Sequence, residues 1–154
     1  MTSNKSWFFI KSLYSGLVLD IERGEKGGRI VTFPQHGGDN QLWTWRKKSL
    51  MSKTGFVLDV DHSNKEKGAK TISWVYHGGL NQQWTLDGDK IISCLNGMAL
   101  DIKGESMEQL VEIVLWPTKS GVWDNQSWTL VPSGSYMKQP SLYCMALFAM
   151  FYFE

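Results

Sequence analysis

The sequence predicts an all-β fold, a β-trefoil, because one unit is written three times along the chain. The octapeptide HGGDNQLW at residues 36–43 returns as HGGLNQQW at residues 77–84, and a shorter form, VWDNQSW, occupies residues 122–128. The tryptophans that end the three copies are 41 and 44 residues apart. A repeat of this period indicates a fold assembled from copies of one supersecondary unit.

A second motif recurs in step with the first. It reads SGLVLDI at residues 15–21, TGFVLDV at 54–60 and NGMALDI at 96–102. The aspartate of each copy precedes the asparagine of the next octapeptide by 20, 22 and 24 residues. Two linked motifs that recur three times establish a threefold repeat.

Each repeat reads as four short strands, rich in Val, Ile, Leu, Phe and Trp and separated by Gly, Asn, Asp, Ser and Lys. The predicted strands are residues 7–12, 17–22, 29–33 and 41–46, then 49–53, 56–61, 70–75 and 82–87, then 90–94, 98–103, 111–116 and 126–131. Short strands with a turn signal every ten or so residues favour an all-β domain.

Twelve strands in three equal parts require an arrangement with threefold symmetry. A four-strand unit cannot bury its apolar face alone, whereas three units around an axis share one core and hide most sheet edges in a closed barrel. We therefore expect one β-trefoil domain over residues 1–132, with repeats at about 7–47, 48–88 and 89–132. Residues 133–154 have no counterpart in the repeats.

Composition narrows the functional class. The chain has 154 residues and a net charge of +1, which gives no electrostatic reason to expect nucleic acid as a partner. The N-terminus has no apolar run typical of a signal peptide, and the two cysteines, Cys94 and Cys144, form no disulfide framework. These features indicate a cytoplasmic protein, or a secreted one if the N-terminus is incomplete.

The two motifs together resemble the ricin-B-type (R-type) lectin family. Its signature is the QxW motif, found here at residues 41–43, 82–84 and 126–128, each preceded by Asn and paired with an upstream Leu-Asp. The HGGxNQxW form looks especially like the CBM13 branch. The resemblance covers roughly residues 7–131 and implies a β-trefoil lectin with up to three weak, shallow sugar pockets. It implies galactose, N-acetylgalactosamine or xylan-type glycans as partners, and a structural role for the QxW tryptophans.

The resemblance also implies which residues form the pockets. A carboxylate grips a pair of sugar hydroxyls, an aromatic ring stacks on the sugar, and an amide exchanges hydrogen bonds with a hydroxyl. By repeat, these sugar-binding candidates are Asp20, Phe33, Asn40 and Gln41, then Asp59, Trp74, Asn81 and Gln82, then Asp101, Trp116, Asn125 and Gln126. The adjacent glutamines are expected to support the asparagines.

Alternatives to these roles stay open. Each Asp could anchor its own turn through the backbone, and each ring could fill the core, with Phe33 the strongest candidate because its repeat is shorter. His36 and His77 either line the pocket rim or are plain exposed loop residues, and the second interpretation is favoured. Many R-type sites carry a polar side chain two residues before the ring, where this chain has an apolar one in each repeat: Val31, Ile72 and Val114.

No catalytic motif, metal-ligand spacing or cofactor motif stands out, so we expect binding without turnover, no cofactor and no metal. The alternatives are a protein-interaction trefoil and the targeting module of a larger toxin or hydrolase.

Residues 141–153 carry no charge but are too short to span a membrane. This tail could pack on the trefoil, dock a partner or touch a membrane, or have no evolved role. Membrane contact is otherwise expected only through glycans, and the oligomeric state stays open.

Overall fold

The computed structural model describes residues 5–134, and within them it contains the twelve strands that the sequence predicts. The first repeat holds β1 (Phe8–Ser12), β2 (Val18–Ile21), β3 (Ile30–Phe33) and β4 (Trp43–Arg46). The second holds β5 (Ser49–Ser52), β6 (Val57–Val60), β7 (Thr71–Trp74) and β8 (Trp84–Asp87). The third holds β9 (Lys90–Ser93), β10 (Ala99–Ile102), β11 (Ile113–Trp116) and β12 (Trp128–Pro132). The β-trefoil prediction is confirmed.

Short 3-10 turns occupy places where longer strands were expected. Turn η2 (Asp39–Gln41) and turn η4 (Leu80–Gln82) contain the Asn-Gln pair of their repeats, so the predicted strands 41–46 and 82–87 in fact begin at the tryptophans. The twelfth strand likewise begins at Trp128, two residues later than predicted. Three further turns follow the Leu-Asp motifs, namely η1 (Glu22–Gly24), η3 (Asp61–Ser63) and η5 (Lys103–Glu105).

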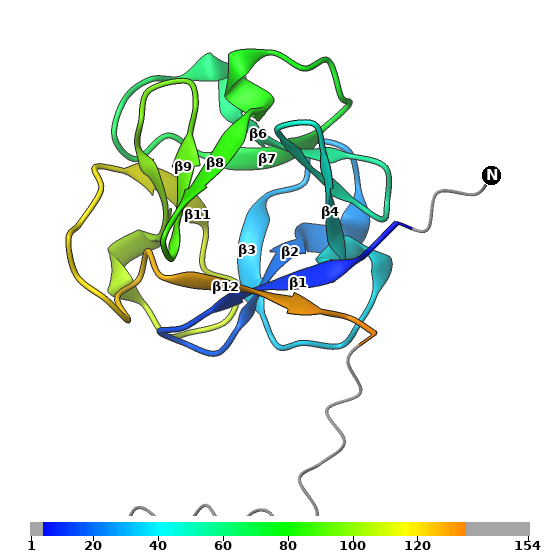
Figure 1. The fold of residues 1–154 in the computed structure, drawn as a ribbon, viewed down its shortest axis with the longest axis horizontal. Helices are drawn as coiled ribbons and strands as arrows, with labels where there is room; N and C mark the ends of the chain where they lie inside the picture. The colour runs from blue at the N-terminus through cyan, green and yellow to red at the C-terminus, as the bar shows by residue number, and fades with distance from the viewer. Residues whose placement is uncertain (1–4, 135–154) are drawn as a thin grey trace, which may run out of the picture.

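The first and last strands of each repeat form a barrel around the threefold axis. Strand β1 pairs antiparallel with β12 along five residue pairs and meets β4 at its start, while β4 pairs with β5 and β8 with β9. Two backbone hydrogen bonds join the remaining neighbours, from Trp84 N to Lys48 O (2.9 Å) and from Trp128 N to Asp89 O (2.8 Å). The ends of the described chain thus lie side by side (Figure 1).

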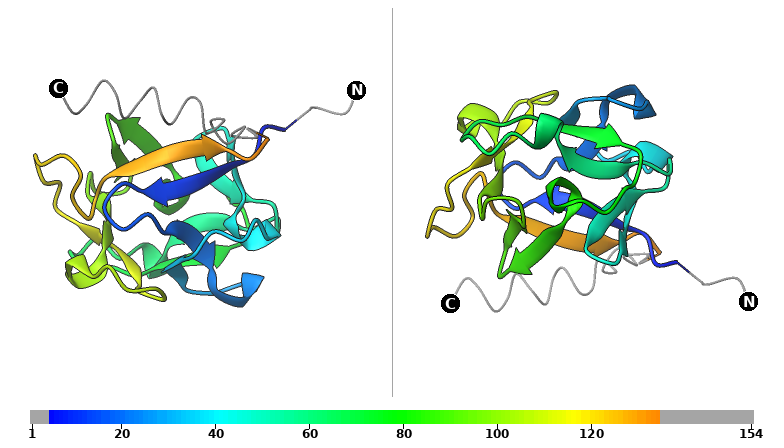
Figure 2. Two further views of the ribbon diagram at one scale, coloured as in Figure 1. Left: turned by 90° about the horizontal axis from the view of Figure 1, so that it is seen from below. Right: turned by 90° about the horizontal axis from the view of Figure 1, so that it is seen from above.

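The two middle strands of each repeat form a hairpin, and the three hairpins meet at one end of the barrel. Their pairs are β2–β3, β6–β7 and β10–β11, in the same register in each repeat. Isolated bridges join each hairpin to the next, at Arg29–Ile72, Lys70–Val114 and Val31–Glu112. Figure 2 shows the β2–β3 and β10–β11 hairpins on the side of the molecule away from β12.

The core consists of equivalent residues from the three repeats. The QxW tryptophans, Trp43, Trp84 and Trp128, are all buried there. Each indole N–H donates to the backbone carbonyl of the leucine that precedes the motif aspartate, at 3.1 to 3.3 Å. A buried indole needs one such acceptor, so the tryptophan repeats because the fold repeats, and the structural role assigned to it holds.

The tail predicted at residues 133–154 lies outside the described residues except for Ser133 and Gly134, where the β12 end is followed by a turn. Within the described chain, no helix is long and apolar enough to cross a membrane.

Candidate functional site

The strand register brings a carboxylate, an apolar side chain and an aromatic ring to one face of each hairpin. Asp59 on β6 lies opposite Ile72 on β7, and Trp74 follows two residues later. Side chains that face each other across a ladder, and those two residues apart on one strand, share a face of the sheet. The same register places Asp20 by Val31 and Asp101 by Val114. Each predicted Asp and ring therefore stands in one pocket wall.

A fully buried glutamine fixes each carboxylate. Gln82 Nε2 donates to Asp59 Oδ2 (2.8 Å) and to Val75 O (2.9 Å), while its Oε1 accepts from the backbone N–H of His77 (2.8 Å) and of Gly78 (3.2 Å). Gln41 makes the equivalent four bonds, and Gln126 makes three of them. All three glutamines have no exposed surface. They therefore have no surface for direct contact with a ligand, and what they do is position the aspartate.

The asparagines hold the second carboxylate oxygen. Asn40, Asn81 and Asn125 each donate through Nδ2 to the Oδ1 of their aspartate, at 3.0 to 3.2 Å. The carboxylates accept these side-chain amides and no backbone N–H in the described structure, so the alternative of an aspartate that anchors its own turn is wrong.

Burial dominates the electrostatics of the three carboxylates. Removal from solvent raises the pKa of Asp20, Asp59 and Asp101 above the ordinary value of 3.8, although the hydrogen bonds from Gln and Asn oppose the shift. A desolvated carboxylate gains more from a hydroxyl donor than one in water does, because water no longer competes for its oxygens.

The two histidines face the carboxylates, contrary to the interpretation favoured from the sequence. His36 Nε2 lies 3.6 Å from Asp20 Oδ2, and His77 Nε2 lies 3.9 Å from Asp59 Oδ2. Each ring is oriented by its Nδ1, which accepts the backbone N–H two residues later at 3.0 Å. Both side chains are nearly half exposed, so they form the pocket rim and present Nε2 to a ligand.

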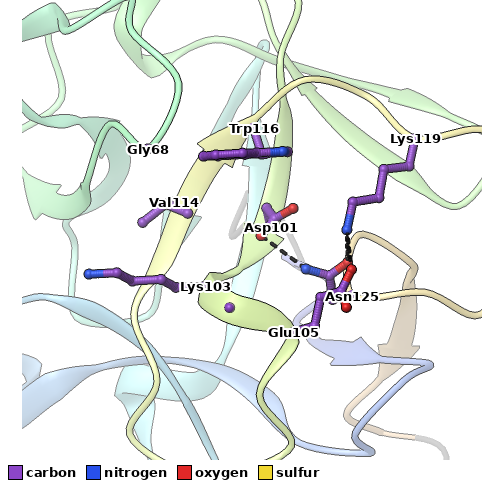
Figure 3. Close-up of a pocket in the computed structure, with 9 residues that line it drawn as sticks. Gly68, Asp101, Lys103, Glu105, Val114, Trp116, Lys119 and Asn125 are labelled. Atoms are coloured by element: carbon purple, nitrogen blue, oxygen red, sulfur yellow. Dashed lines mark hydrogen bonds and ion pairs between the residues drawn. The ribbon is translucent and has the colours of Figure 1, made fainter.

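Lys119 takes the place of the histidine in the third repeat, and sequence reasoning missed it. Its backbone N–H donates to Gln126 Oε1 (2.8 Å), as the histidine N–H does in the other repeats, and it too follows the ring residue by three positions. Its Nζ donates to Asn125 Oδ1 (2.7 Å) and pairs with Glu105 (2.8 Å). The sequence signal that could have found this rim residue is its position, three residues after the ring in each repeat. In this pocket the Asn125 side-chain oxygen already accepts a hydrogen bond from Lys119, and the lysine ammonium group lies at the pocket rim (Figure 3).

The second and third repeats have open cavities, of about 280 Å³ around Asp59, Trp74 and His77 and about 270 Å³ around Asp101 and Trp116. Both tryptophans are 38% exposed and are therefore walls of the cavity and not part of the core. Figure 3 shows the Trp116 indole edge-on above Asp101, with Val114 beside them.

The first repeat differs in its ring. Phe33 is half-buried and packs edge-to-face against the His36 ring, with 5.8 Å between ring centroids. Part of its surface is thus covered by the rim histidine, and it offers less open area than the tryptophans of the other repeats. The structure therefore places Phe33 partly beneath the rim histidine, and its part in sugar binding stays a prediction.

A lysine from the preceding repeat lies over each tryptophan. Lys26 Nζ is 4.6 Å from the Trp74 ring centroid, and Lys67 Nζ is 5.4 Å from that of Trp116. Such cation–π contacts hold the ring in place. In the second and third repeats the ring wall is thus built from two repeats, which the sequence did not reveal.

These features define a β-trefoil with a polar, ring-walled pocket in its repeats, and comparison with known proteins agrees. The sequence matches the ricin-type beta-trefoil lectin domain over residues 6–128 and again over residues 48–149, offset by about one repeat. The chain belongs to the ricin-type β-trefoil lectin domain family. Its assignment to the CBM13-like branch stays a prediction.

Solved structures with the same fold include three of different origin. ThreeFoil, a designed threefold-symmetric protein, is 30% identical with a TM-score of 0.74, and the match covers 81% of this chain and 97% of that one. The C-half of an earthworm R-type lectin in complex with GalNAc is 27% identical, with a TM-score of 0.68 and coverages of 82% and 98%. An exo-beta-1,3-galactanase from Clostridium thermocellum is 28% identical with a TM-score of 0.72, and the match covers 86% of this chain but 31% of the enzyme. A comparison with curated proteins gives no match.

Proposed function

We propose that this protein is a carbohydrate-binding lectin that binds glycans without turnover. One observation carries the proposal: in the second and third repeats, a desolvated carboxylate and a partly exposed indole converge on one open cavity. The carboxylate accepts a pair of hydroxyls while the indole covers the apolar face of the sugar ring. Phosphate or other anionic groups would be repelled from a pocket centred on a carboxylate.

Galactose-type glycans are the first candidates and xylan-type glycans the second. The earthworm lectin domain, which is similar to 82% of this chain, is described in complex with GalNAc. The apolar side chain beside each carboxylate (Val31, Ile72 or Val114) leaves a sugar with one hydrogen bond fewer than a polar side chain there would give. That difference weakens binding by about 0.5–1.5 kcal/mol per pocket. Strong binding would then depend on several pockets engaging one clustered glycan.

The platform tryptophans give a sharper test than the aspartates do. Removing Asp59 would leave the buried amide of Gln82 and the half-buried amide of Asn81 without their acceptor and endanger the fold. Trp74→Ala and Trp116→Ala instead remove side chains that are 38% exposed. We expect each to weaken its own pocket about tenfold, because stacking area is lost while the hydrogen bonds stay.

The experiment is a glycan array followed by calorimetry on the full chain, with galactose-type and xylan-type probes. Trp123→Ala is the matched control, because Trp123 is 65% exposed and lines neither cavity. Binding that the control keeps and the Trp74→Ala/Trp116→Ala double variant loses supports the proposal. A double variant that binds as well as the natural protein would refute the assignment of these pockets.

A protein-interaction trefoil is the second candidate. The loop that leads into β12 exposes Val122 and Trp123, which are apolar and 75% and 65% accessible. Exposed apolar side chains of this size are typical of partner-binding surfaces. Folded protein that binds no glycan on the array would favour this alternative. The resemblance to one part of a galactanase also leaves room for a targeting role in a larger enzyme.

A further inference from the structure

A basic groove adjoins the second pocket. Its cavity of about 390 Å³ is lined by Lys47, Lys48, Tyr76 and His77, among others. His77 also lines the cavity that contains Asp59 and Trp74. The two cavities are therefore neighbours that share one wall, and a ligand seated on Trp74 that extends past His77 enters the basic groove.

Two side-chain contacts hold the Tyr76 ring and the loop beside the groove in place. The Arg46 guanidinium stacks on the Tyr76 ring, with Cζ 3.8 Å from the ring centroid. On the far side, Gln83 Nε2 donates to Gly78 O (2.9 Å) and braces the loop. A stacked arginine and a braced loop present a ligand with a surface that needs little reorganisation.

The charge of the groove is not neutralised by the protein. Arg46 ends β4, Lys47 and Lys48 form the turn between β4 and β5, and all three are exposed. None of them takes part in an ion pair or a side-chain hydrogen bond with another residue of the described chain, apart from the stacking of Arg46. Three neighbouring cations without counter-charges attract an anion.

The threefold symmetry supplies an internal comparison. Lys48 O accepts the N–H of Trp84, and Asp89 O accepts the N–H of Trp128, so the two turns are equivalent. At this place the junction with the third repeat reads Asp87-Gly88-Asp89, where the junction with the second reads Arg46-Lys47-Lys48. The basic charge of the groove is therefore a feature of one turn and is not imposed by the fold.

We propose that the second pocket, together with this groove, binds an anionic glycan. A neutral sugar of the glycan lies between Asp59 and Trp74, and a carboxylate or sulfate group on the same or the adjoining sugar reaches Lys47 and Lys48. The anionic group cannot lie in the pocket itself, because Asp59 repels it. This inference rests on the proposed lectin function and specifies its ligand.

The test measures dissociation constants by calorimetry on the full chain with neutral and anionic members of matched pairs. The probes are lactose with its sialylated and sulfated forms, and a xylooligosaccharide with its glucuronic-acid-substituted form. We expect at least one anionic form to bind about threefold to tenfold more tightly than its neutral parent, from two charge contacts at a surface site. The preferred form identifies sialic acid, sulfate or uronic acid as the source of the charge. The preference should disappear in about 0.5 M salt, because dissolved ions then screen the attraction between the lysines and the anionic group.

The variants assign the effect to the groove. Lys47→Gln/Lys48→Gln keeps the side-chain stems and should abolish the anionic preference while leaving the neutral parent's affinity unchanged. Lys5→Gln/Lys65→Gln removes the same charge from two other exposed lysines and should keep the preference. Trp74→Ala should weaken the anionic and neutral forms together. A preference that survives Lys47→Gln/Lys48→Gln overturns the inference, and so does equal affinity for both members of every pair. In either case, binding of the neutral probes still supports the lectin function. Folded protein that binds no probe overturns both.

Discussion

At the scale of single residues, the pocket depends on buried amides that hold a carboxylate out of water. Gln82 has no exposed surface and divides four hydrogen bonds between Asp59 and the loop that carries His77. The same side chain therefore fixes the acceptor of a sugar hydroxyl and the rim that faces it. This double role explains why Gln follows Asn in all three motifs, and it does so without any direct contact between Gln and sugar.

The raised pKa of the aspartates predicts how sugar binding responds to acid. Binding needs the ionised carboxylate, and burial raises the pKa of Asp20, Asp59 and Asp101 above 3.8. Sugar should therefore be released on acidification at a pH above 3.8. Protonating these groups does not destabilise the fold, since a raised folded-state pKa contributes stability at low pH and loses it as pH rises through that pKa.

A carboxylate outside the pockets governs stability at lower pH. The Lys90 ammonium and neighbouring hydrogen bonds hold the pKa of Asp124 below 3.8, so its contribution to stability is lost only as pH falls through that lower value. Release of sugar should precede acid unfolding. Affinity and circular dichroism measured over the same pH series check the order, and affinity that stays constant until the protein unfolds would contradict it.

At the scale of secondary-structure elements, the glycines before η2 and η4 make room for the pocket rim. Gly79 has an ordinary φ of −66°, so its backbone conformation accepts alanine. A Cβ at this position would lie 2.8 Å from His77 Cε1 and 2.9 Å from Asn81 Oδ1. The equivalent Gly38 has the same two close contacts. The second glycine of the HGG motif therefore serves the pocket, while the first supplies a turn, with φ of +77° at Gly78.

Gly79→Ala should consequently weaken the second pocket. The added methyl group displaces the His77 ring and the Asn81 amide, and with them the geometry around Asp59. We expect affinity for a ligand of that pocket to fall about tenfold, with about 1–3 kcal/mol lost from the free energy of unfolding through overpacking. Gly134→Ala is the control, because a Cβ there meets no atom within 4 Å. Calorimetry and urea denaturation measure the two effects, and unchanged sugar affinity in Gly79→Ala would show that the rim does not contact sugar.

At the scale of the whole molecule, no repeat is complete by itself. Lys26 of the first repeat lies over Trp74 of the second, and Lys67 of the second lies over Trp116 of the third. The core likewise takes one buried tryptophan from each repeat. The pockets are therefore products of the assembled trefoil and are shared between neighbouring repeats.

A peptide of residues 48–88, one repeat, should neither fold nor bind sugar. A single four-strand unit leaves its apolar face in water, and the peptide also lacks the lysine that lies over Trp74. Circular dichroism and calorimetry with the best ligand of the full chain provide the test, with the full chain as the control. A folded peptide that bound sugar with the full chain's affinity per pocket would show that the repeats are independent.

Much of the fold was predictable because its signals are local. The strands follow from short runs of β-forming residues between turn residues, and the resemblance to R-type lectins implied one carboxylate and one ring per repeat. The pattern of apolar residues did not predict that the strands begin after Gln41 and Gln82. Each glutamine lies in a turn instead, because its side chain hydrogen-bonds a carboxylate more than 20 residues earlier in the chain.

The sequence by itself determined the threefold repeat and the trefoil, since these depend on periodicity and spacing along the chain. The family, and the aspartate and ring predicted for each pocket, came from the resemblance of the repeated motifs to R-type lectins. Only the tertiary structure decided that His77 and Lys119 face the carboxylates, and that lysines from one repeat cover the rings of the next. It also decided that Lys47 and Lys48 lie beside the second pocket. These contacts join residues that lie far apart in the chain or whose orientation depends on buried hydrogen bonds, and neither is written in the local pattern of residues.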